Sequence, residues 1–285
     1  MKTIPIRSIK ATQKEPVFSG SFSIRDLGDL LGGKDMVQEL HRHDFFFLLV
    51  LKKGTGSHEI DFTPYKVCDN AVFLMRPGQV HQLTLQAGTT GYLVEFKPDF
   101  YSPHDKSSLQ LLRRAGNRNF YQPDDDSLRK ILAALTSIFR EYSGKQESYQ
   151  QVIKANLDIL FIELVRQHHK GPPNNVNPYT QERLDELLAL LETHIADYKQ
   201  VSQYAARLNL TPYQLNAITK ATLGKTCSAL IDEHIILEAK RYLLATTNQV
   251  NQIADHLGYE DVSYFIRFFK KQTGYSPESF RHNFR

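Results

Sequence analysis

The chain has 285 residues, of which 41% are hydrophobic and 23% charged, and a formal net charge of +4. That length is enough for two ordinary domains with separate cores. The longest apolar run, Phe45 to Leu51, is far too short to span a bilayer, and the first residues lack the apolar segment of a signal peptide. We therefore expect a cytoplasmic protein with no membrane partner. Only Cys68 and Cys227 are present, which argues against a disulfide framework and against a cysteine-built metal site.

Charge alone does not identify a nucleic-acid partner. Residues 1–178 carry 23 Lys and Arg against 19 Asp and Glu, whereas residues 179–285 carry 12 of each kind. If the C-terminal part binds DNA, its cations must be gathered on one face.

Short β-strands are predicted between about Phe18 and Phe100. Five segments there are rich in β-branched and aromatic residues and are separated by Gly, Pro, Asp and Asn: 45–54, 56–62, 71–78, 79–86 and 90–96. Their even spacing predicts a small antiparallel β-barrel or sandwich.

Two helices are predicted between Asp124 and Lys170. Each carries apolar residues at three- and four-residue spacing: Leu128, Ile131, Leu132, Leu135, Ile138 and Phe139 in the first, and Ile153, Leu157, Leu160, Phe161 and Leu164 in the second. Such helices either pack as a hairpin on their own barrel or form the interface of a homodimer, and the sequence leaves both readings open.

A break in periodicity follows at "KGPPNNVNP", Lys170 to Pro178. Its prolines exclude a continuous helix, so we predict a linker at 171–178. The predicted fold class is α+β, with one domain at 1–170 and an all-α domain at 179–285.

The all-α part contains two segments with the same layout. In "VSQYAARLNLTPYQLNAITKATLG" a short helix ends at Leu208, and a second begins with Thr211 as N-cap and Pro212 at its first position. In "VNQIADHLGYEDVSYFIRFFKKQTG" Gly258 permits the turn and Asp261 caps the second helix. A helix, a tight turn and a second helix form the DNA-reading motif whose second helix enters the major groove.

The second helix of the second unit is predicted to have two different sides. Tyr264, Phe265, Phe268 and Phe269 are expected to hold it against the domain, which leaves an exposed side for base edges and phosphates. A long helix over residues 227–248 would join the two units. Such a connector would let both reading helices enter successive major-groove segments about 34 Å apart.

The segments "LEAKRYLL" and "IADHLGYEDVSYFIRFFKKQTGYSPESFR", with the spacing between them, resemble the C-terminal DNA-binding domain of the AraC/XylS family of bacterial transcription regulators. The resemblance covers about the last hundred residues. It implies a sequence-specific regulator that binds a double-stranded DNA operator, with RNA polymerase as a partner if the protein activates transcription.

The resemblance also implies particular DNA contacts. Base-reading positions fall on Tyr213, Asn216, Ala217, Val262, Ser263, Ile266 and Arg267, phosphate contacts fall on Lys220, Lys270 and Lys271, and the capping Thr211 is counted with them. Thr219, Ala217 and Ile235 depart from the residues usual in the family. We therefore expect the first unit to read less sequence than the second.

The N-terminal part, at "ELHRHDFFFLLVLKKGTGSHEIDF" and "FLMRPGQVHQL", resembles the cupin-like sensor domain of many AraC-type regulators. The resemblance implies a non-enzymatic protein whose barrel binds a small-molecule effector. Because alternate residues of a strand share one face, we predict the ligand-binding residues to be His41, His43, Phe45, Phe47 and His81.

The same histidines raise an alternative. Metal-binding cupins build a site from His-x-His and a later His, but they add a carboxylate where this chain has Phe46, Phe47 and Leu48. We therefore expect no metal and no cofactor. The alternatives are a metal-dependent cupin enzyme fused to a DNA-binding domain, and a regulator controlled by a partner protein.

Overall fold

A computed structural model of the chain describes residues 5–9, 21–101, 106–167 and 177–284. The chain divides into two compact units, residues 5–172 and residues 173–285. The first combines strands and helices and the second is helical, which confirms the α+β class. Within the described ranges, no helix is both long enough and apolar enough to cross a membrane.

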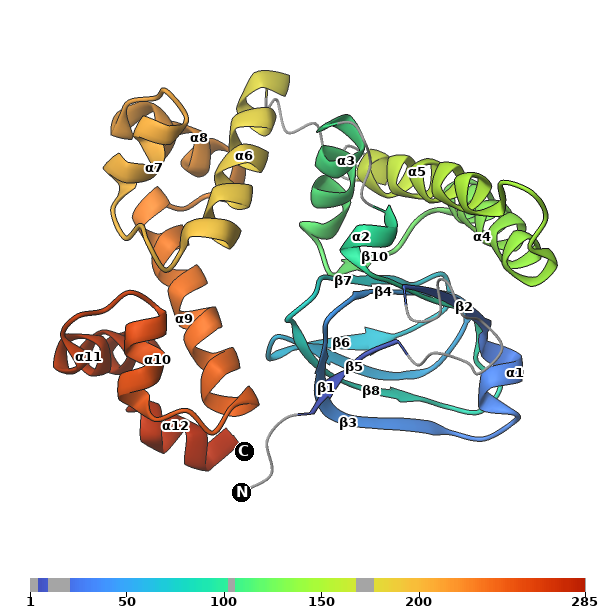
Figure 1. The fold of residues 1–285 in the computed structure, drawn as a ribbon, viewed down its shortest axis with the longest axis horizontal. Helices are drawn as coiled ribbons and strands as arrows, with labels where there is room; N and C mark the ends of the chain where they lie inside the picture. Colours follow the sequence, from blue (N-terminus) through green and yellow to red (C-terminus); the bar gives the residue numbers. More distant parts are fainter. Residues whose placement is uncertain (1–4, 10–20, 102–105, 168–176, 285) are drawn as a thin grey trace. The chain divides into compact units, whose positions relative to one another are not determined.

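Two five-stranded sheets form the body of the first unit (Figure 1). One has the order β1-β3-β8-β5-β6 and the other the order β10-β7-β4-β9-β2. The pairing is antiparallel throughout these sheets except where β1 runs parallel to β3. The strands are β1 Ile6–Arg7, β2 Phe22–Asp26, β3 Met36–His43, β4 Phe46–Lys53, β5 Gly56–Ile60, β6 Thr63–Val67, β7 Val72–Met75, β8 Val80–Leu85, β9 Thr90–Phe96 and β10 Phe120–Tyr121. Two separate sheets make a sandwich, so the cupin-like body is not a closed barrel.

Strand β4 explains why the longest apolar run of the sequence lies there. Phe47, Leu49 and Leu51 are buried in the core between the two sheets. Leu48 and Val50 point the other way, into the core beneath the helices. A strand covered on both faces needs apolar residues at every position.

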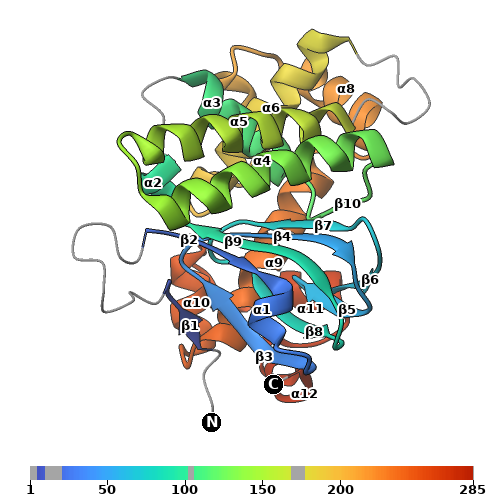
Figure 2. The ribbon, with the colours of Figure 1, turned by 90° about the vertical axis from the view of Figure 1, so that its right-hand side faces the viewer.

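Helices cover the outer face of the β4 sheet (Figure 2). They are α2 Pro98–Tyr101, α3 Lys106–Gly116, α4 Asp125–Gly144 and α5 Tyr149–Gln167, and the short α1 Leu27–Leu31 follows β2. Helix α4 begins where the Asp124 carboxylate accepts a hydrogen bond from the backbone N–H of Ser127, 2.9 Å away. An N-cap of this kind satisfies a backbone donor that the helix itself cannot.

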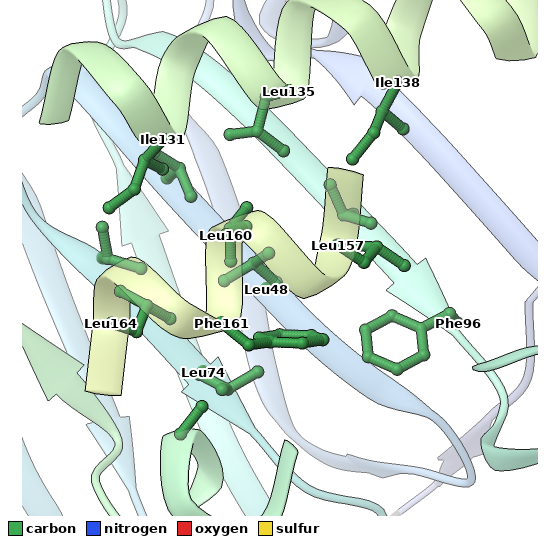
Figure 3. Close-up of a cluster of buried hydrophobic side chains, with 14 of the residues drawn as sticks. Leu48, Leu74, Phe96, Ile131, Leu135, Ile138, Leu157, Leu160, Phe161 and Leu164 are labelled. Atoms are coloured by element: carbon green, nitrogen blue, oxygen red, sulfur yellow. The ribbon is translucent and has the colours of Figure 1, made fainter. Parts of the chain in front are cut away.

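The apolar stripes of α4 and α5 pack on their own sheet (Figure 3). Side chains of both helices meet residues of β4, β7 and β9, and the rings of Phe96 and Phe161 lie 6.1 Å apart. The two helices therefore pack as a hairpin on their own domain, which is one of the two arrangements that the sequence allowed. A homodimer through these helices stays a prediction, and it would have to use their outer faces, where Ile159 is 49% exposed.

The second unit consists of seven helices within residues 177–284. They are α6 Pro178–His194, α7 Val201–Arg207, α8 Pro212–Leu223, α9 Cys227–Ala245, α10 Val250–His256, α11 Val262–Thr273 and α12 Pro277–Phe284. The predicted long connector is α9, which ends at Ala245, three residues before the expected end. Thr246 is extended there and stops the helix.

We predict that limited proteolysis of the full chain cuts first within residues 170–178 and leaves two folded fragments. Most of that linker, residues 171–176, lies outside the described residues. The reason for the expectation is the sequence: three prolines, and no apolar side chain other than Val176 that burial would protect. The cleavage sites would be read by mass spectrometry. First cleavage inside the β-sandwich would mean that the boundary is misplaced.

Candidate DNA-reading helices and a buried histidine cluster

The helix pairs α7–α8 and α10–α11 share one local construction. Both α7 and α10 begin with a Gln-x-x-Gln capping box, at Gln200 and Gln249. Each first helix ends at a leucine, which is followed by a residue with a positive φ: Asn209 at 54° and Gly258 at 75°. The same helix ending is therefore used twice, and the connection to the next N-cap is one residue longer in the second pair, from Leu257 to Asp261, than in the first, from Leu208 to Thr211.

The second helix of each pair has a fixed start. Thr211 accepts a hydrogen bond from Gln214 N at 3.2 Å, and Asp261 accepts one from Ser263 N at 2.8 Å. Both helices end at a left-handed glycine, Gly224 or Gly274. Caps at both ends set the length and the starting point of each helix.

Helix α11 has one buried and one exposed side. Phe265 and Phe269 are completely buried, and Phe268 is half-buried with its ring stacked on Tyr259. Tyr264, also predicted to anchor the helix, is 54% exposed and meets the domain at one face of its ring, which is stacked on Tyr259 with the ring centres 6.0 Å apart. The opposite side exposes Ser263, Arg267, Lys270 and Lys271, with Val262 and Ile266 half-buried beside them.

Helix α8 exposes a less charged side. Tyr213 is 84% exposed, and Ala217 and Lys220 are also exposed. The amide of Asn216 is already occupied. Its Oδ1 accepts from Cys227 N at 2.9 Å, and its Nδ2 donates to the Pro212 carbonyl at 3.0 Å. These two bonds use one lone pair of Oδ1 and one hydrogen of Nδ2, so a base contact by Asn216 would have to be made while its amide is held by the bond that ties α8 to the start of α9.

Arg267 has a weak ionic neighbour. Its guanidinium lies 3.8 Å from the Asp261 carboxylate, and the two side chains are 69% and 63% exposed. Exposed pairs of this kind contribute less than about 1 kcal/mol. Arg267 can therefore exchange this partner for another at low cost.

The predicted effector residues meet in the interior of the sandwich. His41 and His43 come from β3, His81 comes from β8, and all three are buried. A β-bulge between Gln38 and His41 adds one residue to β3 relative to β8. Because of that extra residue, Met36 and the two histidines all face the core although they differ in parity.

A fourth histidine, which the sequence reasoning missed, belongs to the same cluster. The Nε2 of His58 on β5 lies 2.8 Å from the Nδ1 of His81. The Nε2 of His81 lies 2.7 Å from that of His43 and 3.0 Å from that of His41. The available signal was alternation, since His58 and the core residue Ile60 share one face of β5.

Aromatic rings form the wall of the cluster. The His43 ring lies 4.3 Å from that of Phe45 and 5.4 Å from that of Phe47, and the His58 ring lies 4.7 Å from that of Phe73. The structure thus brings together all five residues predicted for the ligand. Whether they bind one stays a prediction.

The cluster is neutral at pH 7. Burial lowers the pKa of His41 from 6.5 to about 4 and the pKa values of His43 and His58 to about 3, and it holds the pKa of His81 well below 6.5. Within the described part of the chain, the Nδ1 atoms of His43 and His58 are buried without a hydrogen-bond partner. Unpaired buried polar atoms are uncommon and call for an explanation.

Comparisons with known proteins agree with both parts of this picture. Residues 34–165 match the AraC-like ligand binding domain family, and residues 204–283 match a helix-turn-helix domain family. The chain belongs to the AraC/XylS family. It is a DNA-binding transcription regulator with a ligand-binding domain.

Similar AraC/XylS-family proteins span most of the chain. An HTH-type transcriptional activator RhaS of Escherichia fergusonii is 26% identical over 251 residues, which are 85% of this chain and 86% of that protein. RhaS of Escherichia coli O157:H7 is 24% identical over 243 residues, again 85% and 86% of the two chains. Among solved structures, ToxT of Vibrio cholerae O395 is 14% identical, with a TM-score of 0.43 over 92% of this chain and 97% of that chain.

For this regulator we predict that Gly258→Ala strongly destabilises the DNA-binding unit. A Cβ at Gly258 would lie 1.9 Å from the Ala196 carbonyl oxygen, and φ is +75° there. Gly224→Ala is the matched control, because Gly224 also has a positive φ, +70°, but a Cβ there meets nothing within 4 Å. The control is expected to cost about 1–2 kcal/mol from backbone strain alone, and Gly258→Ala clearly more. Urea unfolding followed by circular dichroism measures both, and equal losses would contradict the steric argument.

Proposed function

We propose that the chain binds its operator through the exposed sides of α8 and α11 and is controlled by an effector that binds at the histidine cluster. The observation that carries the first half is the two-sided character of α11. Phe265 and Phe269 are buried in the core, while Arg267, Lys270 and Lys271 are exposed together although the unit has no net charge. A DNA-binding unit without net charge needs its cations on one face, and these three residues meet that requirement.

The residues on these sides suit different tasks. The guanidinium of Arg267 can pair with O6 and N7 of a guanine, whereas Lys220, Lys270 and Lys271 are suited to phosphates. On α8, Tyr213 and Ala217 offer mainly apolar contact, and Asn216 is engaged with Cys227. We infer that α11 contributes more of the sequence specificity than α8.

The effector half of the proposal rests on the composition of the sandwich interior. Among the described residues, the core between the sheets is apolar except for the buried Glu95, which pairs with Arg25, and for the place where His41, His43, His58 and His81 converge. A pocket that orients its ligand needs a few polar groups in apolar surroundings, and this cluster with Phe45 and Phe47 has that composition. Effector binding would change operator affinity only if the two DNA-binding states differ in their affinity for the effector.

The two RhaS proteins named above are transcriptional activators, which favours regulation over catalysis. We propose that this chain also activates transcription and contacts RNA polymerase. A homodimer formed through the outer faces of α4 and α5 would double the DNA contacts.

We predict that Arg267→Ala loses selectivity at one base position and weakens cognate operator binding by about 1–3 kcal/mol, with little change in non-specific binding. Lys271→Ala is the control. Loss of a phosphate contact should weaken binding to all sequences and reduce the salt slope by about one counterion. Binding of each variant to a library of operator variants separates the two effects, and an unaltered base preference in Arg267→Ala would contradict direct readout.

Asp261→Asn tests whether Arg267 depends on its ionic neighbour for operator binding. Asparagine keeps the N-cap acceptor but removes the charge 3.8 Å from Arg267. If Arg267 reads a base, this variant should bind the operator at least as tightly as the wild type and with the same preference. A loss of preference would instead show that Arg267 needs Asp261 to be positioned.

A further inference from the structure

Three ring nitrogens of the histidine cluster lie close together. The Nε2 atom of His81 lies 2.7 Å from the Nε2 of His43 and 3.0 Å from the Nε2 of His41. One nitrogen from each of the three residues lies within 4.8 Å of the others, and all three side chains are buried. Such a convergence has to be explained by protons or by a cation.

The position of one proton is fixed by a backbone group. His41 Nδ1 lies 2.7 Å from the carbonyl oxygen of Glu39, and a carbonyl only accepts hydrogen bonds. The proton of a neutral His41 is therefore on Nδ1. Its Nε2 presents a lone pair to His81.

The remaining protons do not satisfy the cluster. If His81 carries its proton on Nε2, that single N–H faces two nitrogens, those of His41 and His43, and a full hydrogen bond reaches only one. If His43 carries its proton on Nε2 as well, two N–H groups face each other at 2.7 Å. If it does not, its Nδ1–H is a buried donor, and that atom has no partner among the described residues. In the remaining arrangement His81 donates its Nδ1–H to His58 and His43 donates its Nε2–H to His81. The Nδ1–H of His58 then has no partner among the described residues, and the lone pair of His41 Nε2 faces that of His81 Nε2 at 3.0 Å.

We propose that His41, His43 and His81 hold a divalent transition-metal ion through their Nε2 atoms, and that His58 is a positioning residue for His81. Each Nε2 lone pair then points at the ion. The proton of His81 sits on Nδ1 and is donated to Nε2 of His58, whose own proton moves to Nδ1. The Nδ1–H groups of His43 and His58 keep no partner among the described residues, so the gain is confined to the three Nε2 lone pairs, which no longer face one another. No proton leaves the four neutral imidazoles, so the change is one of tautomer alone.

The observed separations are close to those of a coordination sphere. Two nitrogens about 2.1 Å from one metal ion lie roughly 3.0 Å apart at a right angle and about 3.4 Å apart at a tetrahedral angle. Two of the three separations, 2.7 and 3.0 Å, need only a small outward movement to reach this range. The three ligand atoms span up to 4.8 Å, whereas two nitrogens bound to one ion are at most about 4.2 Å apart, so the rings of His41 and His43 would also have to move toward each other. The Glu39 carbonyl and His58 would fix the orientation of two of the three rings, as hydrogen-bond partners of metal ligands commonly do.

The ligand set indicates the class of metal. Imidazole nitrogens suit zinc, copper, nickel and iron, whereas magnesium and calcium prefer oxygen. Three neutral ligands leave the charge of the ion uncompensated, and the exposed Arg7 adds a further positive charge nearby. The open coordination position would therefore favour an anionic oxygen. Hydroxide or an anionic group of the effector would occupy the ligand position that a carboxylate takes in metal-binding cupins. Where the effector is the ligand, the inference rests on the proposed function.

The test uses the full chain, stripped with a chelator and titrated with Co²⁺ and with Zn²⁺. We expect one ion per chain, a visible Co²⁺ spectrum of nitrogen and oxygen ligation, and a rise in Tm on binding. His43→Gln and His81→Gln should each weaken binding by at least about 100-fold. The control, His194→Gln, removes a histidine that pairs with Asp197 in the other unit and should change nothing.

His58 has its own readout. His58→Phe should weaken metal binding by about 10- to 100-fold and alter the Co²⁺ spectrum, in the range found for partners of metal ligands. His58→Gln keeps an acceptor for the His81 Nδ1–H and should restore much of the loss. A purely structural role for His58 would leave the spectrum unchanged in both variants.

Wild-type protein that binds no Co²⁺ would overturn the metal site, and this outcome needs no variant to fold. Unchanged affinity in His43→Gln and His81→Gln, with folding verified by circular dichroism, would overturn it as well. Operator affinity with and without Zn²⁺ tests the effector role separately. If the ion binds but operator affinity is the same in both forms, the metal site stands and the proposed effector role of the cluster falls.

Discussion

Buried apolar contacts along α9 hold the DNA-binding unit together. The N-terminal half of this helix, with Cys227, Leu230 and Ile231, lies in one core with Tyr204 of α7 and Leu215 of α8. Its later turns contact α10 and α12, and Arg281 of α12 donates to the Leu243 carbonyl at 2.9 Å. Because one continuous helix packs against both helix-turn-helix pairs, the exposed sides of α8 and α11 are fixed relative to each other. Each reading helix can expose one side to DNA because its other side packs in this shared core.

The N-terminal unit follows a different constraint. Strand β4 is buried on both faces and separates two cores, one beneath α4 and α5 and one between the sheets. The first is built from apolar and aromatic side chains and serves packing, and the buried Ser127 and Glu163 lie on the two helices that cover it. The second includes four imidazoles in an interior where a charged histidine is disfavoured. A polar cluster in a dry core destabilises the protein unless it is satisfied, so its presence points to binding.

The sequence predictions were most accurate for features that depend on neighbouring residues, such as helix caps and turns. Thr211, Asp261 and Gly258 act through hydrogen bonds and backbone angles within a few residues, and the structure has them at the predicted helix starts and turn. The apolar stripes of α4 and α5 were equally visible, but their partner sheet was not, so the hairpin and dimer readings stayed open.

What the sequence concealed depends on long-range geometry. His58 joins His81 across a strand pairing 23 residues apart, and the bulge in β3 that turns His41 and His43 inward has no residue signature. Asn216 looked free to read bases, yet its amide bonds to Cys227, eleven residues later. Tyr264 sits next to buried Phe265 on the helix and nevertheless turns toward solvent. Each of these facts follows from tertiary placement and not from residue type.

The most direct test of the central claim is a hydroxyl-radical footprint of the full chain on its operator at single-nucleotide resolution. Two reading helices fixed by α9 should protect, for each bound chain, two patches on the same face of the duplex, one helical turn or about 34 Å apart. The Tyr213→Ala and Lys220→Ala double variant should weaken only one patch of that pair. A single patch per chain, or two patches on opposite faces, would contradict the account.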